Sequence, residues 1–310
     1  MSNIVTPVAS SVPADVRDWF TLLKPRVVSL VVFTGAIGLA VAPGRLHPVL
    51  AFTAVLCIAV AAGAAGAINM WYDRDIDAVM RRTARRPIPA GRIEPGAALG
   101  FGIVLAVSSV MLMYLATNAV AAFVLALSIM FYVFVYTMWL KRRTPQNIVI
   151  GGAAGAFPPL IGWAAVTGDI SLFPILMFTI VFFWTPPHFW ALSLYASGDY
   201  ARAGVPMLPV VAGSRTTRWH VLGYTAVLGA VSLSPWVLGY AGPIYGVAAA
   251  LLGLGFLYGA VRMMLEAQDE TGRSLIKDKA ARWTFRYSLL YLFILFASMA
   301  VDHAVWHGAS

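Results

Sequence analysis

The chain alternates long apolar stretches with short polar connections along almost its whole length. A helix that crosses the hydrocarbon core of a bilayer needs about 20 predominantly apolar residues. The chain has nine such stretches, at about 27–44, 48–69, 97–116, 118–138, 147–167, 171–195, 219–239, 243–263 and 284–302. Several connections are very short, so neighbouring spans are expected to form antiparallel hairpins. The pattern predicts an all-α integral membrane protein with nine transmembrane helices.

Residues 1–310 are expected to form a single membrane domain, with residues 1–20 as a flexible N-terminal arm. The two halves show a weak internal similarity. Basic residues next to a proline precede the first and the fifth span, and a polar cluster ends a span about 45 residues later in each half. This similarity predicts a site between two four-helix halves, with a ninth helix added.

Composition supports a membrane environment, because 60% of the residues are hydrophobic and only 11% are charged. A soluble globular protein has about 25% charged residues. The net charge is +9, but the basic residues lie in short loops between apolar spans and not on a soluble basic face. Nucleic acid is therefore excluded as a partner, and the lipid bilayer is the expected surrounding. The single cysteine, Cys57, excludes an internal disulfide.

The basic residues also predict the orientation in the membrane. With nine spans, 21 of the 22 Lys and Arg residues fall on one side, and only Arg45 falls on the other. Basic loops stay in the cytoplasm, so we expect a cytoplasmic N-terminus and an external C-terminus. The first 20 residues resemble neither a cleavable signal nor a mitochondrial transit segment, which favours the inner (plasma) membrane of a prokaryote.

An acidic motif ends the second span. Asn69, Asp73 and Asp77 are four residues apart, so on a helix they share one face, whereas Asp75 points roughly the opposite way. Closely spaced carboxylates repel one another unless a cation lies between them. Hard oxygen ligands of this kind suit Mg²⁺, which also bridges to phosphate oxygens. The alternative is a solvated acidic loop that is neutralised by neighbouring arginines.

A basic cluster accompanies the acidic motif. The connection between the second and third spans holds six arginines, namely Arg74, Arg81, Arg82, Arg85, Arg86 and Arg92. Because Arg binds phosphate oxygens in pairs, the cluster predicts a lid over a polyanion, with a plain cytoplasmic loop as the alternative. Further candidates for phosphate binding on the same side of the membrane are Lys24, Arg26, Tyr136, Lys141 and Arg142. Each basic residue alone is typical of a membrane anchor, but together they are expected to surround a diphosphate.

A second polar cluster lies at the end of the sixth span and after it. Pro186-Pro187 is expected to break the helix and to free backbone carbonyls inside a protein-lined cavity. His188 follows, and a structural role and a functional one both stay open for an imidazole at membrane depth. Asp199 and Arg202 follow after the span. The glycine-rich stretch 151–155 fits either close helix packing or a groove for an apolar ligand.

Six segments of the chain carry a family resemblance. The acidic motif with its downstream Arg-Pro-Ile-Pro-Ala-Gly resembles the UbiA superfamily of intramembrane prenyltransferases. The segments that begin at Lys24, Thr144, Pro158, Trp184 and Asp199 are similar to the branch of this superfamily that farnesylates protohaem IX. The resemblance runs from about residue 20 to 300, and Pro-Pro-His-Phe-Trp separates this branch from relatives that act on quinone precursors.

The resemblance implies a UbiA-type bundle of nine helices around a central cavity. It implies that protohaem, farnesyl diphosphate and water give haem O and diphosphate, with Mg²⁺ as cofactor and haem A synthase as a downstream partner. It also implies Asn69, Asp73 and Asp77 as the first metal motif and Asp199 as part of a second one. This chain departs from the second motif, because Ala203 stands where many members have another aspartate. His188 is a candidate for the missing place.

The predicted site residues have catalytic, metal-binding and substrate-binding roles. The catalytic and metal-binding candidates are Asn69, Asp73, Asp77 and Asp199, with His188 as a further catalytic candidate. The substrate-binding candidates are Lys24, Arg26, Arg82, Arg86, Arg92, Tyr136, Lys141 and Arg202.

Other functions stay open at this stage. They are prenyl transfer to an aromatic quinone precursor, transport, and haem binding without catalysis. A transporter would also use broken helices and charges at mid-membrane depth, but here the acidic groups gather at one face. A haem chaperone would not need a diphosphate site.

Overall fold

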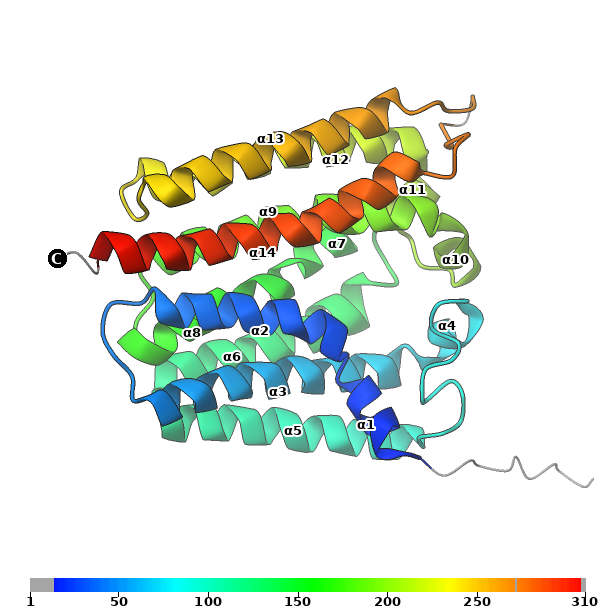
Figure 1. Ribbon diagram of the computed structural model, residues 1–310. Helices are drawn as coiled ribbons and strands as arrows, with labels where there is room; N and C mark the ends of the chain where they lie inside the picture. Colours follow the sequence, from blue (N-terminus) through cyan, green and yellow to red (C-terminus); the bar gives the residue numbers. More distant parts are fainter. Residues whose placement is uncertain (1–13, 271, 308–310) are drawn as a thin grey trace, which may run out of the picture.

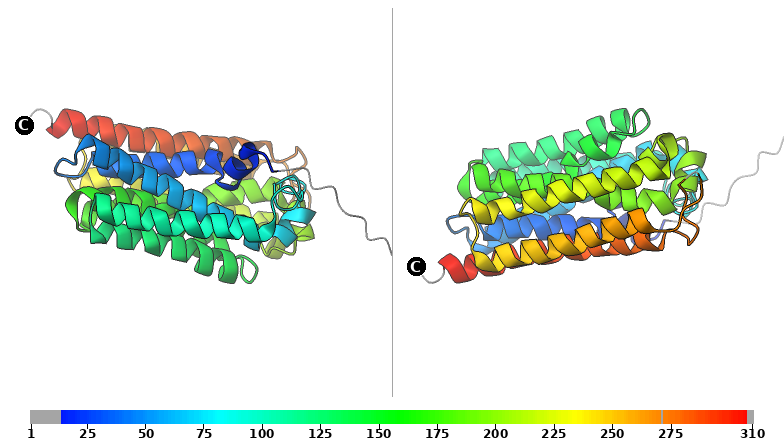
Figure 2. Two further views of the ribbon diagram at one scale, coloured as in Figure 1. Left: turned by 90° about the horizontal axis from the view of Figure 1, so that it is seen from below. Right: turned by 90° about the horizontal axis from the view of Figure 1, so that it is seen from above.

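The computed structural model describes residues 14–270 and 272–307. Within these residues the regular secondary structure consists of helices. The long helices run side by side in an elongated bundle, as the views from two further sides confirm (Figures 1 and 2). The long helices are α2 (Pro25–Ala40), α3 (Pro48–Tyr72), α5 (Pro95–Ala116), α6 (Ala119–Met130) with η1 (Phe131–Leu140), α8 (Ala153–Thr167), α9 (Leu172–Tyr195), α12 (Gly213–Val237), α13 (Pro243–Leu265) and α14 (Lys279–His307).

The described residues contain eight helical segments that are long and apolar enough to cross a membrane. A ninth span forms if α1 (Val16–Leu22) and α2, which meet at an angle of 53°, are counted together. Alone, the 16 residues of α2 reach about 24 Å, which is short of the roughly 30 Å of hydrocarbon core. The predicted all-α membrane fold is confirmed. Of the expected N-terminal arm, residues 16–20 belong to α1, and residues 1–13 lie outside the described part.

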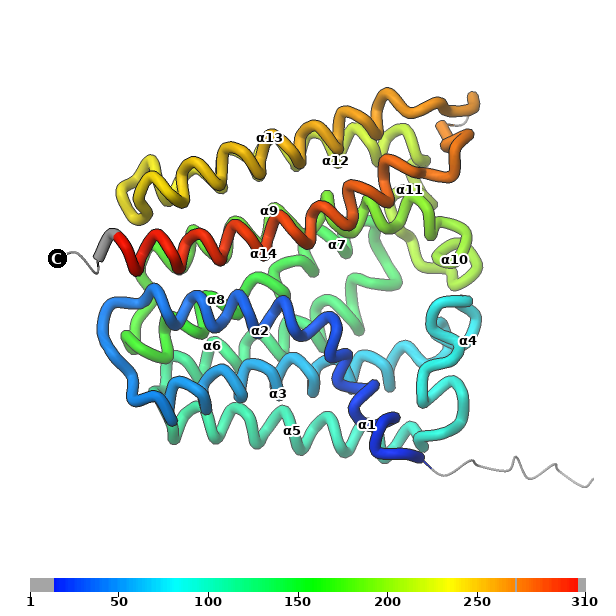
Figure 3. Tube along the Cα trace, viewed as in Figure 1, coloured from blue at the N-terminus to red at the C-terminus, as the bar shows by residue number. Residues whose placement is uncertain are grey.

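Four short helices gather at one end of the bundle (Figure 1). They are α1, α4 (Arg74–Val79), α10 (Ser197–Arg202) and α11 (Leu208–Val211). The C-terminal end of α14 lies at the opposite end. The acidic motif and the second polar cluster therefore meet at the same end, although more than 100 residues separate them. The chain trace also shows α2 beside α14 (Figure 3), where the rings of Phe33 and Phe293 lie 4.6 Å apart.

Glycines bring α2 and α8 into backbone contact. A Cβ atom added to Gly162 would lie 2.0 Å from the carbonyl oxygen of Gly35, and one added to Gly38 would lie 2.1 Å from that of Pro159. No side chain fits at these positions. Small residues at helix crossings are typical of membrane proteins, where van der Waals packing replaces a hydrophobic driving force between helices.

Two spans depart from a regular α-helix in ways that the apolar pattern does not predict, and a third is regular where a break was expected. The fourth span ends in the π-helix η1, and the fifth is divided at Gly152 between α7 (Asn147–Gly151) and α8. The expected break at Pro186-Pro187 is wrong, because α9 continues through both prolines. Membrane helices tolerate proline where neighbouring groups satisfy the backbone.

Candidate active site

The acidic motif keeps its helical spacing across the junction of α3 and α4. The Asp73 amide donates to the Asn69 carbonyl at 2.9 Å, and the Asp77 amide donates to the Asp73 carbonyl at 2.8 Å. The side chains of Asn69, Asp73 and Asp77 are consequently buried together. The Asp75 side chain is 60% exposed, as expected for a residue on the opposite face.

Each buried side chain of the motif contacts its own cation. Lys24 Nζ donates to Asn69 Oδ1 at 2.6 Å, and Arg86 donates to Asp77 Oδ2 at 2.6 Å.

Lys141 forms an ion pair with Asp73 Oδ2. The three cations come from the start of α2, the arginine-rich connection and the end of η1. The structure thus brings together basic residues that the sequence places on one side only.

The π-helix explains how Lys141 reaches the acidic motif. The Lys141 amide donates to the carbonyl of Tyr136, five residues earlier, at 2.9 Å. The wider turn of a π-helix places Tyr132, Tyr136 and Lys141 on nearly the same face, whereas an α-helix would turn Lys141 away from Tyr136. The rings of Tyr132 and Tyr136 lie 5.3 Å apart, and both line a cavity. Sequence periodicity gave no signal for this element, because η1 is apolar on most sides.

Asp75 has a different partner from the buried aspartates. Arg142 donates to both of its carboxylate oxygens, at 2.7 and 2.6 Å. These hydrogen bonds lower the pKa of Asp75. The same guanidinium lies 4.9 Å from the ring centre of Tyr72, and one of its nitrogens is 3.5 Å from Asp73 Oδ1. Asp75 thus holds Arg142 beside the motif from outside.

The motif has the donor set that Mg²⁺ requires. Asp73 Oδ1 is buried without a hydrogen-bond partner, and the amide oxygen of Asn69 and the carboxylate of Asp77 lie on the same face. Within the described residues, no three His, Cys, Asp or Glu side chains gather around one point that could hold a metal ion. Mg²⁺ commonly takes one or two carboxylates and completes its shell with water and phosphate oxygens. These residues fit that mode of binding.

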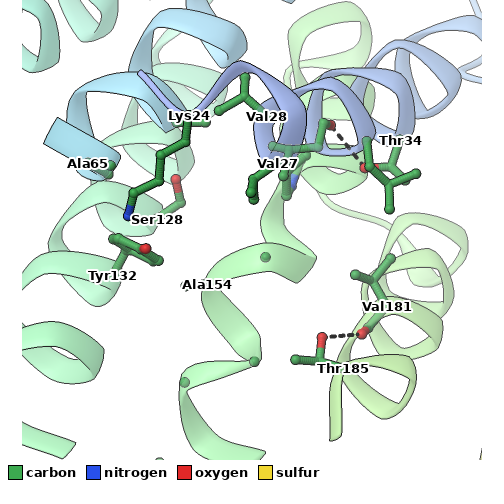
Figure 4. A pocket seen from close by; sticks show the side chains of 18 of the residues that line it. Lys24, Val27, Val28, Thr34, Ala65, Ser128, Tyr132, Ala154, Val181 and Thr185 are labelled. Carbon is green, nitrogen blue, oxygen red and sulfur yellow. Dashed lines mark hydrogen bonds between the residues drawn. The ribbon is translucent and has the colours of Figure 1, made fainter. Parts of the chain in front are cut away.

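A cavity of about 410 Å³ lies beside the motif. Lys24, Arg26 and Arg82 line it, together with residues that are mostly apolar. Figure 4 shows Lys24 extending from the start of α2 toward Tyr132. One end of the cavity is therefore cationic, and the remainder suits a hydrocarbon chain.

The glycine-rich stretch serves both of its predicted purposes. A Cβ atom on Gly151 would lie 2.2 Å from the ring of Tyr136, so this position allows close packing. A Cβ atom on Gly155 would meet nothing within 4 Å, and Gly155 lines the cavity. Close contact at the first glycine positions Tyr136, and the last glycine leaves space for a ligand.

His188 lines the cavity from α9 and is buried. Its ring is stacked between Trp184, with ring centres 4.3 Å apart, and Phe285, with ring centres 4.7 Å apart. Its Nδ1 lies 2.6 Å from the hydroxyl of Ser288. Phe285 and Ser288 were not among the predicted site residues, because nothing in the local sequence connects α14 with α9.

Three predicted site residues belong neither to the cavity lining nor to the acidic motif and its ion pairs. Asp199 pairs with Arg202 one turn later on α10, and Arg92 donates to Asp18 at 2.9 Å. Asp199 remains near the arginine-rich connection, because Arg82 donates to the hydroxyl of the adjacent Tyr200 at 3.4 Å. The metal-binding role of Asp199 and the substrate-binding roles of Arg202 and Arg92 stay predictions.

Comparisons with known proteins agree with this architecture. The profile of the UbiA prenyltransferase family matches residues 31–290. A protoheme IX farnesyltransferase of Granulibacter bethesdensis is 67% identical over 96% of this chain and 95% of its own length. Another of Gluconacetobacter diazotrophicus is 65% identical over 95% of this chain and 94% of its own length.

Solved structures show the same fold at low sequence identity. A digeranylgeranylglyceryl phosphate synthase matches with a TM-score of 0.74 at 16% identity, over 93% of this chain and 98% of its own. A UbiA homolog from Archaeoglobus fulgidus, bound to GPP and Mg²⁺, matches with a TM-score of 0.64 at 15% identity, over 90% of this chain and 99% of its own.

Proposed function

Because this chain belongs to the UbiA prenyltransferase family, and within it to the protohaem IX farnesyltransferases, we propose that it makes haem O. The farnesyl group of farnesyl diphosphate is joined to a vinyl group of protohaem IX, water is added, and diphosphate leaves. The observation that carries this proposal is the cluster of paired carboxylates and cations beside an apolar cavity. The resemblance further supports haem A synthase as the partner that consumes the product.

The polar cluster supplies the groups that a diphosphate needs. Asn69, Asp73 and Asp77 hold Mg²⁺, which offsets the charge that builds up on the leaving diphosphate. Lys141 and Arg86 pair with the carboxylates, and with substrate present they bind the phosphate oxygens. The A. fulgidus homolog is bound to GPP and Mg²⁺, which supports a prenyl diphosphate and Mg²⁺ as ligands of this fold.

Lys24 and Arg82 line the cationic end of the cavity and complete the set around the diphosphate. Arg offers paired donors to phosphate oxygens, whereas Lys offers a compact charge.

The cavity determines the fate of the farnesyl group. Its apolar walls hold the prenyl chain and exclude water, so the allylic cation formed on loss of diphosphate is protected from early hydrolysis. Tyr132 and Trp184 line this space, and aromatic side chains stabilise a cation through their π-electrons. A protohaem vinyl group then attacks the cation, and water adds to the new carbocation, loses a proton and leaves a hydroxyl group.

Incubation of the purified full-length protein with protohaem, farnesyl diphosphate and Mg²⁺ tests the proposal. Mass analysis of the extracted haem is expected to show the addition of one farnesyl group and one hydroxyl group. Parallel reactions lack one component each, and a further control uses the Asp73→Ala variant. Unchanged haem, together with prenylation of an added hydroxybenzoate, would assign the chain to quinone-type chemistry instead.

A further inference from the structure

Ser288 of α14 contacts two residues of α9 that line the cavity. Its backbone carbonyl accepts a hydrogen bond from Trp184 Nε1 at 2.8 Å, and its Oγ lies 2.6 Å from His188 Nδ1. The same Oγ lies 2.7 Å from the carbonyl oxygen of Phe285. Ser288 therefore fixes one aromatic wall of the cavity to the last helix.

The two short contacts of Ser288 Oγ identify the protonated nitrogen of His188. A hydroxyl group has one proton, and a backbone carbonyl has none. The hydroxyl proton must therefore point to the Phe285 carbonyl, and the proton between Ser288 and His188 must belong to Nδ1. In a neutral imidazole that carries its proton on Nδ1, the lone pair is on Nε2.

The surroundings of the ring direct this lone pair toward the cavity. Trp184 and Phe285 hold the ring from its two faces, and Ser288 fixes its rotation at Nδ1. Among the described residues the structure gives Nε2 no hydrogen-bond partner, and His188 lines the cavity. Metal-binding histidines are held in this way, with one ring nitrogen donating to a fixed acceptor and the other facing the metal.

We propose that Ser288 is a positioning residue that orients His188 to bind the iron of protohaem through Nε2. The inference rests on the proposed function, which brings protohaem to this cavity. Imidazole is a common ligand of haem iron and a poor one for Mg²⁺, so His188 serves the haem side of the site and not the metal motif. The hydrogen bond from Nδ1–H to Ser288 Oγ also makes Nε2 a stronger electron-pair donor to the iron.

Spectroscopy of the protohaem-loaded, full-length protein tests the role of Ser288. The His188→Ala variant is expected to lose the iron–imidazole vibration of the ferrous state and to shift the Soret band. The Ser288→Ala variant is expected to keep this vibration at a lower frequency, because Nδ1–H has lost its acceptor. Loss of one buried hydrogen bond predicts a Kd for protohaem about three- to tenfold higher, with the KM for farnesyl diphosphate unchanged.

Two further variants separate positioning from a structural effect. Ser288→Thr retains a hydroxyl group and is expected to return the frequency toward that of the unaltered protein. Ser298→Ala is the matched control, since Ser298 lies on the same helix and donates to the Leu295 carbonyl at 2.8 Å. It is expected to leave the haem spectra unchanged.

Several outcomes would overturn the inference. An unchanged iron–imidazole frequency in Ser288→Ala, with only a lower yield of folded protein, would give Ser288 a structural role. A haem spectrum without an imidazole ligand in a protein that still makes haem O would refute the His188 assignment and leave the proposed function intact. Imidazole-ligated haem without turnover would instead count against the proposed function alone.

Discussion

At the scale of single residues, spacing along a helix separates Asp75 from Asp73 and Asp77. A four-residue spacing is a local property of the α-helix, so the shared face of the motif was predictable from sequence, and the backbone hydrogen bonds through Asp73 preserve it. The partners of these aspartates were not predictable, because Lys24, Arg86 and Lys141 come from distant segments. Ion pairs of this kind depend on tertiary packing.

Replacement of the aspartates is expected to follow their burial. Asp73→Ala and Asp77→Ala each remove a ligand for Mg²⁺ and should lower kcat at least about 100-fold, as the loss of a strong electrostatic group at a reaction centre does. Asp75→Ala breaks an exposed pair with Arg142 and should cost less than about fivefold. Steady-state assays of haem O formation measure all three. Equal losses of kcat in the three variants would show that the shared helical face of Asp73 and Asp77 does not matter for activity.

Removal of the divalent metal is expected to stop the reaction reversibly. A chelator should abolish haem O formation, and added Mg²⁺ should restore it, because the buried carboxylate of Asp73 and its neighbours otherwise lack a cation that bridges to the diphosphate. Binding of protohaem, followed by its Soret band, serves as the control and should not change. Full activity in excess chelator would contradict a metal role for Asn69, Asp73 and Asp77.

At the scale of elements, apolar stretches predicted where helices lie but not how regular they are. All nine stretches fall on helices with shifts of a few residues at their ends. The π-helix η1 and the division at Gly152 were missed, since apolar residues all around a span hide its period. The continuity of α9 through Pro186-Pro187 was missed for another reason. Proline rules for water-soluble helices overestimate its disruption where neighbours satisfy the backbone.

The crossing of α2 and α8 gives a stability prediction. Gly162→Ala places a methyl group 2.0 Å from the Gly35 carbonyl oxygen, so the helices must separate, and overpacking of this kind costs about 1–3 kcal/mol. Thermal unfolding of the protein in detergent should show a lower midpoint.

Gly100→Ala on α5 is the matched control, because its added Cβ atom would meet nothing within 4 Å. It should unfold at the same temperature or slightly higher, since alanine favours the helix by about 0.5–1 kcal/mol. Equal midpoints for the two variants would show that the crossing tolerates a side chain.

At the scale of the whole molecule, the topology assembles the site at one end. The family predicted from the motif segments is confirmed by the matching profile and by relatives that are similar over nearly their full length. The cavity is lined by residues of both halves and of α14, which the weak internal similarity anticipated in outline. The contact between Ser288 and His188 was beyond sequence analysis, because their positions differ by 100 residues.

The same topology predicts the orientation in the membrane. The connection that carries Arg86 and the one that carries Lys277 lie at the end that holds α1, and the end of α14 lies opposite (Figure 1). Because 21 of 22 basic residues fall on the α1 side of the predicted spans, this end should face the cytoplasm. Substrate diphosphate would then enter from the compartment where soluble prenyl diphosphates and Mg²⁺ are available.

Reporter fusions in an inner membrane measure this orientation directly. Fusions at Arg86 and Lys277 should behave as cytoplasmic, and fusions at Gly168 and Ser310 should behave as external, although Ser310 lies outside the described residues. Gly168 lies in the connection between α8 and α9, at the end away from α1, and so serves as an independent check on the C-terminal fusion. A cytoplasmic C-terminus with an external Gly168 would require an even number of spans. It would show that one of the four long helices after Gly168, which are α9, α12, α13 and α14, does not cross the membrane, because four crossings leave both positions on the same side.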